Sequence, residues 1–165
     1  MKHFSNLIGI KPGRIRIALS RNIKFTKGSN VEFCGDARFG HNTFITAIGG
    51  KIVFGHNFSG NQDVIYNSDN GGLLQFGNDC LVGPRCIFRT SNHNFTSTEK
   101  PIRVQGHISK DIKIGDDVWI GANVVVLPGV SIGNHSVIGA GSIVTKNIPE
   151  NVIAVGNPAR VLRFR

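Results

Sequence analysis

His93 is the side chain of this sequence best suited to proton transfer. It lies in the run TSNHNF over 90–95, at the start of a long polar stretch without a regular hydrophobic period. Because imidazole titrates near neutral pH, a neutral histidine here could accept a proton from a hydroxyl or an amine. The alternative interpretation is a solvated loop histidine without a chemical role. A loop of this length inside a compact domain favours a functional role.

The other reactive side chains favour structural roles. Cys80 and Cys86 lie six positions apart, like core residues elsewhere in the chain, and three cysteines without a CxxC pair indicate reduced thiols. Asp116 and Asp117 are expected to cap turns. A carboxylate could also orient His93, but the sequence does not indicate which one. His107 lies in the same polar stretch as His93 and could contact an acceptor. No HxxxxH pair is present, so we predict no metal site.

A repetitive scaffold must hold these side chains. Between residues 114 and 146 an aliphatic residue recurs every six positions, and glycine follows it in four of the units. The aliphatic positions are Ile114, Ile120, Val126, Ile132, Ile138 and Val144. A sustained six-residue period with glycine predicts a parallel β-helix, an all-β solenoid with about 18 residues in each coil.

The repeat also divides the chain, which we interpret as one domain over residues 1–165. We expect an N-terminal cap over 1–24, weaker coils over 25–92, an extruded loop over 93–111, regular coils over 112–148 and a C-terminal cap over 149–165. Within the weaker coils, residues 59–72 are polar and rich in turn formers, which indicates a longer corner. The repeat alone predicts the fold, and its interruption carries the functional hypothesis.

Composition limits the partners. The net charge of +9 favours a polyanionic partner, such as a phosphate-bearing cofactor or an acidic glycan. No nucleic-acid-binding motif accompanies this charge, so we predict no nucleic-acid partner. The sequence contains neither a signal-peptide core nor an apolar run long enough to span a bilayer. We therefore expect a cytoplasmic protein without a transmembrane segment, and peripheral contact with a membrane stays open.

The most regular stretch resembles a known family. It reads IGDDVWIGANVVVLPGVSIGNHSVIGAGSIVTKNIP and is followed by VGNPARV. This pattern is similar to the hexapeptide-repeat acyltransferases, above all to maltose and galactoside acetyltransferases and polysaccharide O-acetyltransferases. The resemblance implies a single-stranded left-handed parallel β-helix with an extruded loop and a short C-terminal cap. It also implies a homotrimer with active sites between subunits.

The resemblance assigns roles to individual residues. His93 corresponds to the general base that takes the proton from the acceptor, and Trp119 corresponds to a residue lining the cleft beside that base. The alternative interpretation of Trp119 is packing between subunits. Acetyl-CoA is the implied cosubstrate, with no metal required. The implied cofactor-binding residues are Ala122, Ala140, Thr145, Lys146, Arg160 and Arg163. Each small residue among them could equally be a coil corner.

The resulting functional hypothesis is an acetyl-CoA-dependent O-acetyltransferase acting on a sugar hydroxyl, in a surface polysaccharide or its precursor. An N-acetyltransferase of an amino sugar or nucleotide sugar would use the same base and groove, and acetylation of a xenobiotic also stays open. Two interpretations of other classes are disfavoured. A zinc enzyme of the γ-carbonic anhydrase type needs closely spaced histidines, and a non-catalytic β-solenoid scaffold leaves His93 and the cofactor set unexplained.

Overall fold

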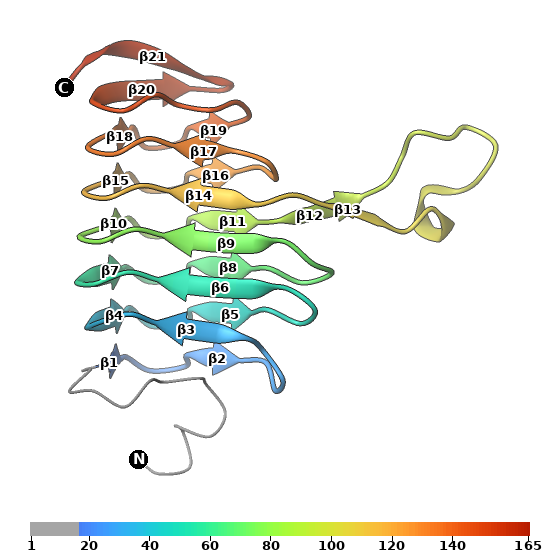
Figure 1. The fold of residues 1–165 in the computed structure, drawn as a ribbon, viewed down its shortest axis with the longest axis horizontal. Helices are drawn as coiled ribbons and strands as arrows, with labels where there is room; N and C mark the ends of the chain where they lie inside the picture. Colours follow the sequence, from blue (N-terminus) through green and yellow to red (C-terminus); the bar gives the residue numbers. More distant parts are fainter. Residues whose placement is uncertain (1–16) are drawn as a thin grey trace.

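The computed structural model describes residues 17–165, with side chains from residue 20 onward. Within this range the chain winds into a rod of stacked coils, and a single long loop projects from its side (Figure 1). The part of the expected N-terminal cap that falls in residues 1–16 lies outside the described residues. No helix long and apolar enough to cross a membrane occurs between residues 17 and 165.

Three parallel sheets form the faces of the rod, and apart from the loop the strands visit them in a fixed order. Face 1 contains β1 (Ile17–Leu19), β4 (Ala37–Phe39), β7 (Phe58–Gly60), β10 (Leu81–Val82), β15 (Trp119–Ile120), β18 (Val137–Ile138), β20 (Val152–Gly156) and β21 (Ala159–Phe164). Face 2 contains β2 (Lys24–Phe25), β5 (Phe44–Thr46), β8 (Ile65–Asn67), β11 (Ile87–Arg89), β16 (Val125–Val126) and β19 (Ile143–Val144). Face 3 contains β3 (Val31–Phe33), β6 (Lys51–Phe54), β9 (Leu73–Phe76), β14 (Ile112–Ile114) and β17 (Ser131–Ile132).

The coils are left-handed. In Figure 1 the chain climbs from the N-terminus at the bottom, the front strands β3, β6, β9 and β14 run from right to left, and the fainter rear strands β5, β8 and β11 run from left to right. This sense opposes the right-handed crossover that parallel strands usually adopt. The left-handed parallel β-helix expected from the resemblance is confirmed.

The regular coils keep the predicted period. The paired inward residues are Ile114 with Ile132, Ile120 with Ile138, and Val126 with Val144, each 18 positions apart. All six side chains are buried, because a six-residue step returns the chain to an inward position on the next face. Backbone hydrogen bonds between successive coils pair the strand edges along each face, so each coil covers the edge of its neighbour.

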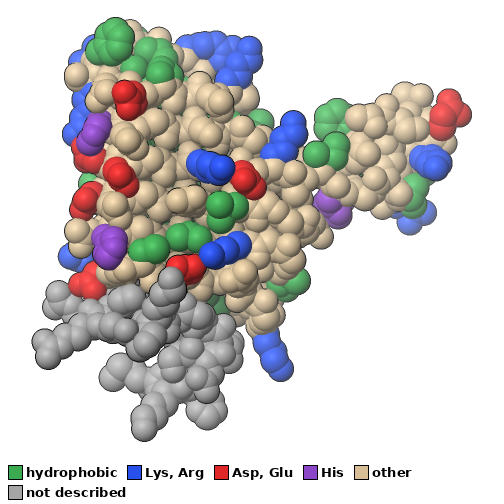
Figure 2. Space-filling view, viewed as in Figure 1, with side chains coloured by type: hydrophobic (Ala, Val, Ile, Leu, Met, Phe, Trp, Pro, Cys, Tyr) green, Lys and Arg blue, Asp and Glu red, His purple; other side chains and the backbone are tan. Residues whose placement is uncertain are grey.

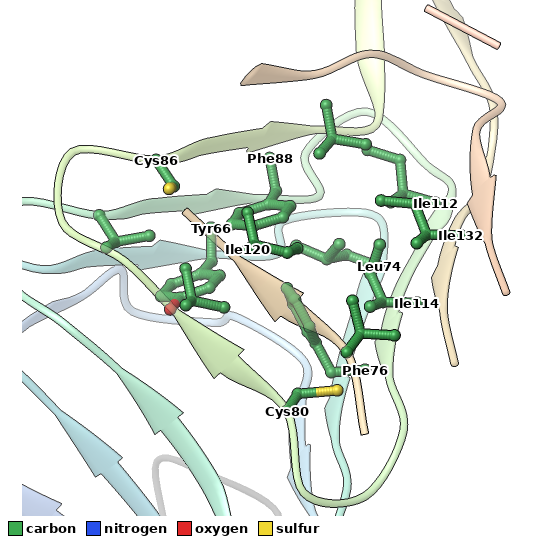
Figure 3. Close-up of a cluster of buried hydrophobic side chains, with 14 of the residues drawn as sticks. Tyr66, Leu74, Phe76, Cys80, Cys86, Phe88, Ile112, Ile114, Ile120 and Ile132 are labelled. Carbon is green, nitrogen blue, oxygen red and sulfur yellow. The ribbon is translucent and has the colours of Figure 1, made fainter. Parts of the chain in front are cut away.

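Aromatic rings continue the same core columns below the regular coils. Phe33, Phe54 and Phe76 stack on face 3, with centroid distances of 5.3 and 5.5 Å and interplanar angles of 15° and 9°. Tyr66 stacks on Phe88 of face 2 at 5.5 Å. Figure 3 shows Tyr66, Phe76 and Phe88 in one cluster with aliphatic side chains of the neighbouring coils. The lower coils are therefore as well packed as the upper ones, although their repeat is weaker in the sequence.

Extra residues enter the lower coils at one corner only, the corner between faces 2 and 3 (the 2/3 corner). Phe54 follows the inward Ile45 by nine positions rather than six, and Phe76 follows Tyr66 by ten. The longer corner expected within residues 59–72 covers 68–72, because β7 and β8 occupy 58–60 and 65–67. Residues 61–64 form an ordinary corner between faces 1 and 2 (the 1/2 corner).

Both ends of the described chain differ from the regular coil. β1 pairs in parallel with β4, so the first coil begins inside the segment expected to be a cap. At the other end β20 pairs in parallel with β18 and antiparallel with β21. This hairpin covers the top edge of face 1 and ends the parallel coil.

Candidate active site

His93 lies where the projecting loop leaves the 2/3 corner. It ends β12 (Ser91–His93), which pairs antiparallel with β13 (His107–Ser109) and places His93 directly opposite His107. The two imidazole centroids are 4.5 Å apart with an interplanar angle of 34°. Among the described residues no hydrogen bond or ion pair engages either ring. The His93 side chain is therefore exposed, with both nitrogens available to a substrate.

Hydrogen bonds to neighbouring segments fix the root of the loop. The Thr90 hydroxyl donates to the Gly71 carbonyl at 3.1 Å, and the Lys110 amide donates to the Thr90 carbonyl at 2.8 Å. Farther out, Gln105 donates to the carbonyls of Ser97 and Lys100 at 2.9 and 2.7 Å. Gln105 caps the short 3-10 helix η1 (Ile102–Val104). The loop is thus a braced ribbon that holds His93 at a defined place.

A shallow groove of about 240 Å³ surrounds His93, and we call it the loop-root groove. It is lined by Arg89, Ser91, Asn92, His93 and His107. The Ser91 hydroxyl is buried and has no hydrogen-bond partner among the residues that the structure describes. Sequence reasoning missed Arg89 and Ser91 as site residues. The sequence could have indicated them, because both lie within four residues of His93, where the six-residue period stops.

Trp119 lies on a different side of the rod. It is an outward residue of β15 on face 1, is 55% exposed, and pairs in register with Leu81 and Val137. Trp119 and Leu81 line a second groove together with Ser59 and Asn61. Within one chain, the structure does not bring Trp119 together with His93, because face 2 separates face 1 from the 2/3 corner.

The residues expected to bind acetyl-CoA divide between two corners and the top of the rod. Ala122 and Ala140 stack at the 1/2 corner, where a Cβ on Gly121 would come within 2.6 Å of the Ala140 nitrogen. Thr145 and Lys146 follow β19 at the 2/3 corner, the corner from which the loop leaves, and both are exposed.

Arg160 and Arg163 lie on β21 and are also exposed. Within residues 17–165 their guanidinium groups donate only to the neighbouring carbonyls of Ala159 and Phe164, at 2.8 and 2.9 Å. Neither cation is paired with a carboxylate in this part of the chain, so either could contact a phosphate.

The acidic pair after β14 serves the scaffold. The Asp116 carboxylate accepts the Asn78 amide at 2.6 Å, which agrees with the expected turn-capping role. Asp117 accepts from Arg165 at 2.9 Å and lies 3.1 Å from His135 Nδ1. Hydrogen bonds from His135 and Arg165 lower the pKa of this carboxyl. Both carboxylates are at the corner between faces 3 and 1, away from the loop.

The buried cysteines are core residues, as predicted. The thiols of Cys80 and Cys86 donate to the carbonyls of Gly115 and Gly121 at 3.1 and 3.0 Å. Burial raises the pKa of Cys80 to about 12, so this sulfur stays protonated and is a poor nucleophile. Between residues 17 and 165, no three His, Cys, Asp or Glu side chains lie close enough together to hold a metal ion.

Comparison with known proteins gives consistent matches. Residues 111–146 match the family model described as bacterial transferase hexapeptide (six repeats). A curated relative, galactoside O-acetyltransferase of Escherichia coli (strain K12), is 42% identical over 116 residues, which cover 70% of this chain and 55% of the relative.

Solved structures agree with the sequence matches. A galactoside acetyltransferase in complex with coenzyme A has a TM-score of 0.68 and 31% identity, covering 99% of this chain and 68% of that one. A maltose O-acetyltransferase from Clostridium difficile 630 has a TM-score of 0.66 and 31% identity, covering 99% and 73%. The chain spans little more than half the length of the curated relatives it matches.

Proposed function

Because this chain belongs to the hexapeptide-repeat acyltransferase family, we propose that it transfers the acetyl group of acetyl-CoA to a sugar hydroxyl, in a surface polysaccharide or its precursor. The observation that carries the proposal is His93. Its imidazole stands free at the root of a braced loop, on a groove open to a substrate. Relatives named as sugar O-acetyltransferases support the same chemistry.

In the proposed reaction His93 acts as the general base. Its neutral imidazole accepts the proton of the acceptor hydroxyl while the oxygen attacks the thioester carbonyl carbon. A C–O bond forms, and the C–S bond then breaks to release the thiolate of coenzyme A. The imidazolium returns the proton to that sulfur. The products are an acetyl ester and coenzyme A, and His93 is again neutral.

Acetyl-CoA is proposed to lie along the upper coils. The small side chains of Ala122 and Ala140 leave the 1/2 corner open to the pantetheine arm. Thr145 and Lys146 would flank the cofactor, and Arg160 and Arg163 would bind its phosphates. Arginine is suited to this role because its guanidinium stays charged and forms bidentate hydrogen bonds with phosphate oxygens. The coenzyme A held by the structurally similar galactoside acetyltransferase supports this assignment.

We propose a homotrimer because the required residues lie on opposite edges of face 2. A second copy would bring the wall formed by Trp119 and Ala122 to the His93 of its neighbour. The outer surfaces support such packing. The outward row on face 2 begins at Lys24 and is apolar above it, with Phe44, Ile65, Ile87, Val125 and Ile143. The outward row on face 3 is Glu32, Val53, Gln75, Lys113 and Ser131. Figure 2, which looks onto face 3, shows charged side chains there.

The apolar row of face 2 is a surface that water disfavours and that a second copy would cover.

A cytoplasmic location stays part of the proposal. The buried thiols of Cys80 and Cys86 fit a reducing compartment, where disulfides are rare.

Substitution of the base tests the proposal. His93→Ala should lower the rate of coenzyme A release in the presence of sugar acceptors by about a hundredfold or more. Binding of coenzyme A, measured by calorimetry, should change little because His93 is assigned to the acceptor side of the thioester. His41→Ala is the matched control, since His41 is also an exposed histidine. Turnover retained by His93→Ala would remove His93 from the reaction.

A further inference from the structure

The polar side chains of the loop-root groove share one property: none of them bonds to another part of the described chain. No hydrogen bond or ion pair engages the side chains of Arg89, Asn92 or His107 within residues 17–165. The buried Ser91 hydroxyl also has no partner, and such a group is costly to leave unpaired. This donor set is therefore free to bind a ligand.

A groove lower on face 2 shows the usual alternative. Its polar residues include Asn22, Asn42 and Asp63, whose side chains bond to one another at 3.2 and 3.0 Å. Thr43, in the same groove, donates to the Gly40 carbonyl at 2.9 Å. These four side chains hold the corner together and have few donors or acceptors left for a ligand, whereas Lys24 in the same groove has no such bond within residues 17–165. The contrast therefore concerns the amide and hydroxyl groups, which are paired in the lower groove and unpaired at the loop root.

The charged side chain that lines the loop-root groove is positive. Arg89 lines it, and none of its lining residues is an Asp or a Glu. The nearby Asp111 carboxylate is already engaged, because it accepts the Leu73 amide at 2.9 Å and lies 3.7 Å from the Lys113 ammonium. An exposed guanidinium with hydroxyl, amide and imidazole donors beside it matches the oxygens of an anion.

We propose that the loop-root groove binds an anionic group of the acceptor, a carboxylate or a phosphate, with Arg89 as the charged anchor. This inference rests on the proposed function, because it assumes that His93 acts on a hydroxyl of the same molecule. Arg89 ends β11 and His93 ends β12, so both contact one short groove. An anion held by Arg89 would keep a neighbouring hydroxyl within reach of the imidazole.

The kinetic test compares neutral and anionic acceptors of matched shape. The acceptors are glucose with glucuronate, galactose with galacturonate, and glucose 1-phosphate, with release of coenzyme A as the readout. In the unmodified enzyme kcat/KM should be about tenfold or more higher for an anionic acceptor than for its neutral match. Arg89→Gln should abolish that preference through a higher KM for the anion, and Arg89→Lys should restore part of it.

Two further results separate this role from its alternatives. Arg38→Gln removes an equal charge from an exposed position on face 1, away from the groove, so it should leave the preference unchanged. If it acts as strongly as Arg89→Gln, general electrostatics explain the preference and the subsite is disproved. If Arg89→Gln raises the KM for acetyl-CoA instead, the anion is a phosphate of the donor and the proposal is overturned.

A binding measurement keeps the inference testable without turnover. The Nε–Hε signal of Arg89, assigned by its loss in Arg89→Gln, should shift with glucuronate or inorganic phosphate and not with glucose. An equal response to glucose, or none to either anion, would contradict the proposal. The Arg89 signal could also shift with anions while the protein fails to bind coenzyme A and His93→Ala has no effect on activity. That combination would reject the proposed function but would still support an anion-binding subsite.

Discussion

The 1/2 corner and the 2/3 corner turn the same coils, but only the first has a fixed length. At the 1/2 corner every inward step is six residues, from Gly60 to Tyr66 as from Ile120 to Val126. Left-handed residues make the turn there, including Asn42 (φ 57°) and Asn123 (φ 58°). Asparagine tolerates this conformation better than most side chains. This corner behaves as a fixed structural edge.

The 2/3 corner instead absorbs all of the irregularity between β5 and β17. The step from Phe88 to Ile114 is 26 positions, which is the ordinary six with twenty residues added. Despite this insertion, Ile114 pairs in register with the residues directly below and above it in face 3. An insertion at one corner leaves the pairing of the sheets intact, because each strand is aligned by its neighbours in the same face. A projecting loop can therefore carry chemistry without weakening the rod.

Removal of the loop is the strongest test of this difference. Deleting residues 91–110 would restore a six-residue step between Phe88 and Ile114 and would remove His93. Acetyl transfer should fall by about a thousandfold or more. The rod should still fold, with a melting temperature within about 5 °C of the original, because the loop contributes no side chain to the core.

Circular dichroism and thermal melts read the fold, and coenzyme A release reads the activity. Full-length His93→Ala is the matched control, since it removes the base and keeps the loop. A deleted protein that fails to form the β-rich structure would show that the loop is part of the scaffold. The separation between a structural corner and a functional one would then be wrong.

The sequence predicted the fold correctly in the coils where each inward position is aliphatic. In the regular coils the residues from Ile114 to Val144 display both the period and the pairing, and the loss of the period locates the loop and His93. The lower coils hide the same period because Gly60 takes an inward position. The Tyr66 ring occupies the space beside it, since a Cβ on Gly60 would clash with the Tyr66 hydroxyl. The glycine and the tyrosine together fill the core volume that two aliphatic residues fill in the regular coils. A search for an aliphatic residue at every sixth position does not detect this pair.

The site was less predictable because it depends on pairing across the loop. His93 meets His107 only through the register of the β12–β13 ribbon, which is set by the turn that Gln105 braces. Arg89 enters the same groove because β11 ends beside that ribbon. Neither relation follows from the six-residue period. The roles of the cofactor residues stay proposals, since they depend on a second copy of the chain.

Two glycines sharpen the comparison of the corners. Gly121, at the 1/2 corner, lies against the backbone of the next coil, where a Cβ would be 2.6 Å from the Ala140 nitrogen and 3.0 Å from its Cα. Gly121→Ala should lower the free energy of unfolding by about 2–4 kcal/mol, because the backbone of two coils must separate. Gly106, in the loop, has φ +76°, and a Cβ added to it would meet no atom within 4 Å. Gly106→Ala should cost about 1 kcal/mol, from the backbone conformation alone.

Urea unfolding at one fixed protein concentration measures both variants, since an oligomer would make stability depend on concentration. The two changes are chemically identical, so each is a control for the other. Equal losses would contradict the assignment of the 1/2 corner as the structural one. A loss at Gly106 larger than that at Gly121 would reverse the assignment of which corner is structural.

The third corner, between faces 3 and 1, is expected to give the smallest effect, through Asp117. Its pKa is lowered in the folded protein by hydrogen bonds from His135 and Arg165. A carboxyl with a lowered folded-state pKa stabilises the protein above its unfolded value of about 4. That contribution is lost as the pH falls through the folded value. Thermal melts should therefore show a small stability loss below about pH 4 that Asp117→Asn reduces. Because the carboxylate is exposed, the difference should shrink further in high salt. An acid dependence unchanged in Asp117→Asn would show that Arg165 holds the C-terminal strand to this corner through the Asp117 and His135 carbonyls alone, which it contacts at 3.4 and 3.1 Å.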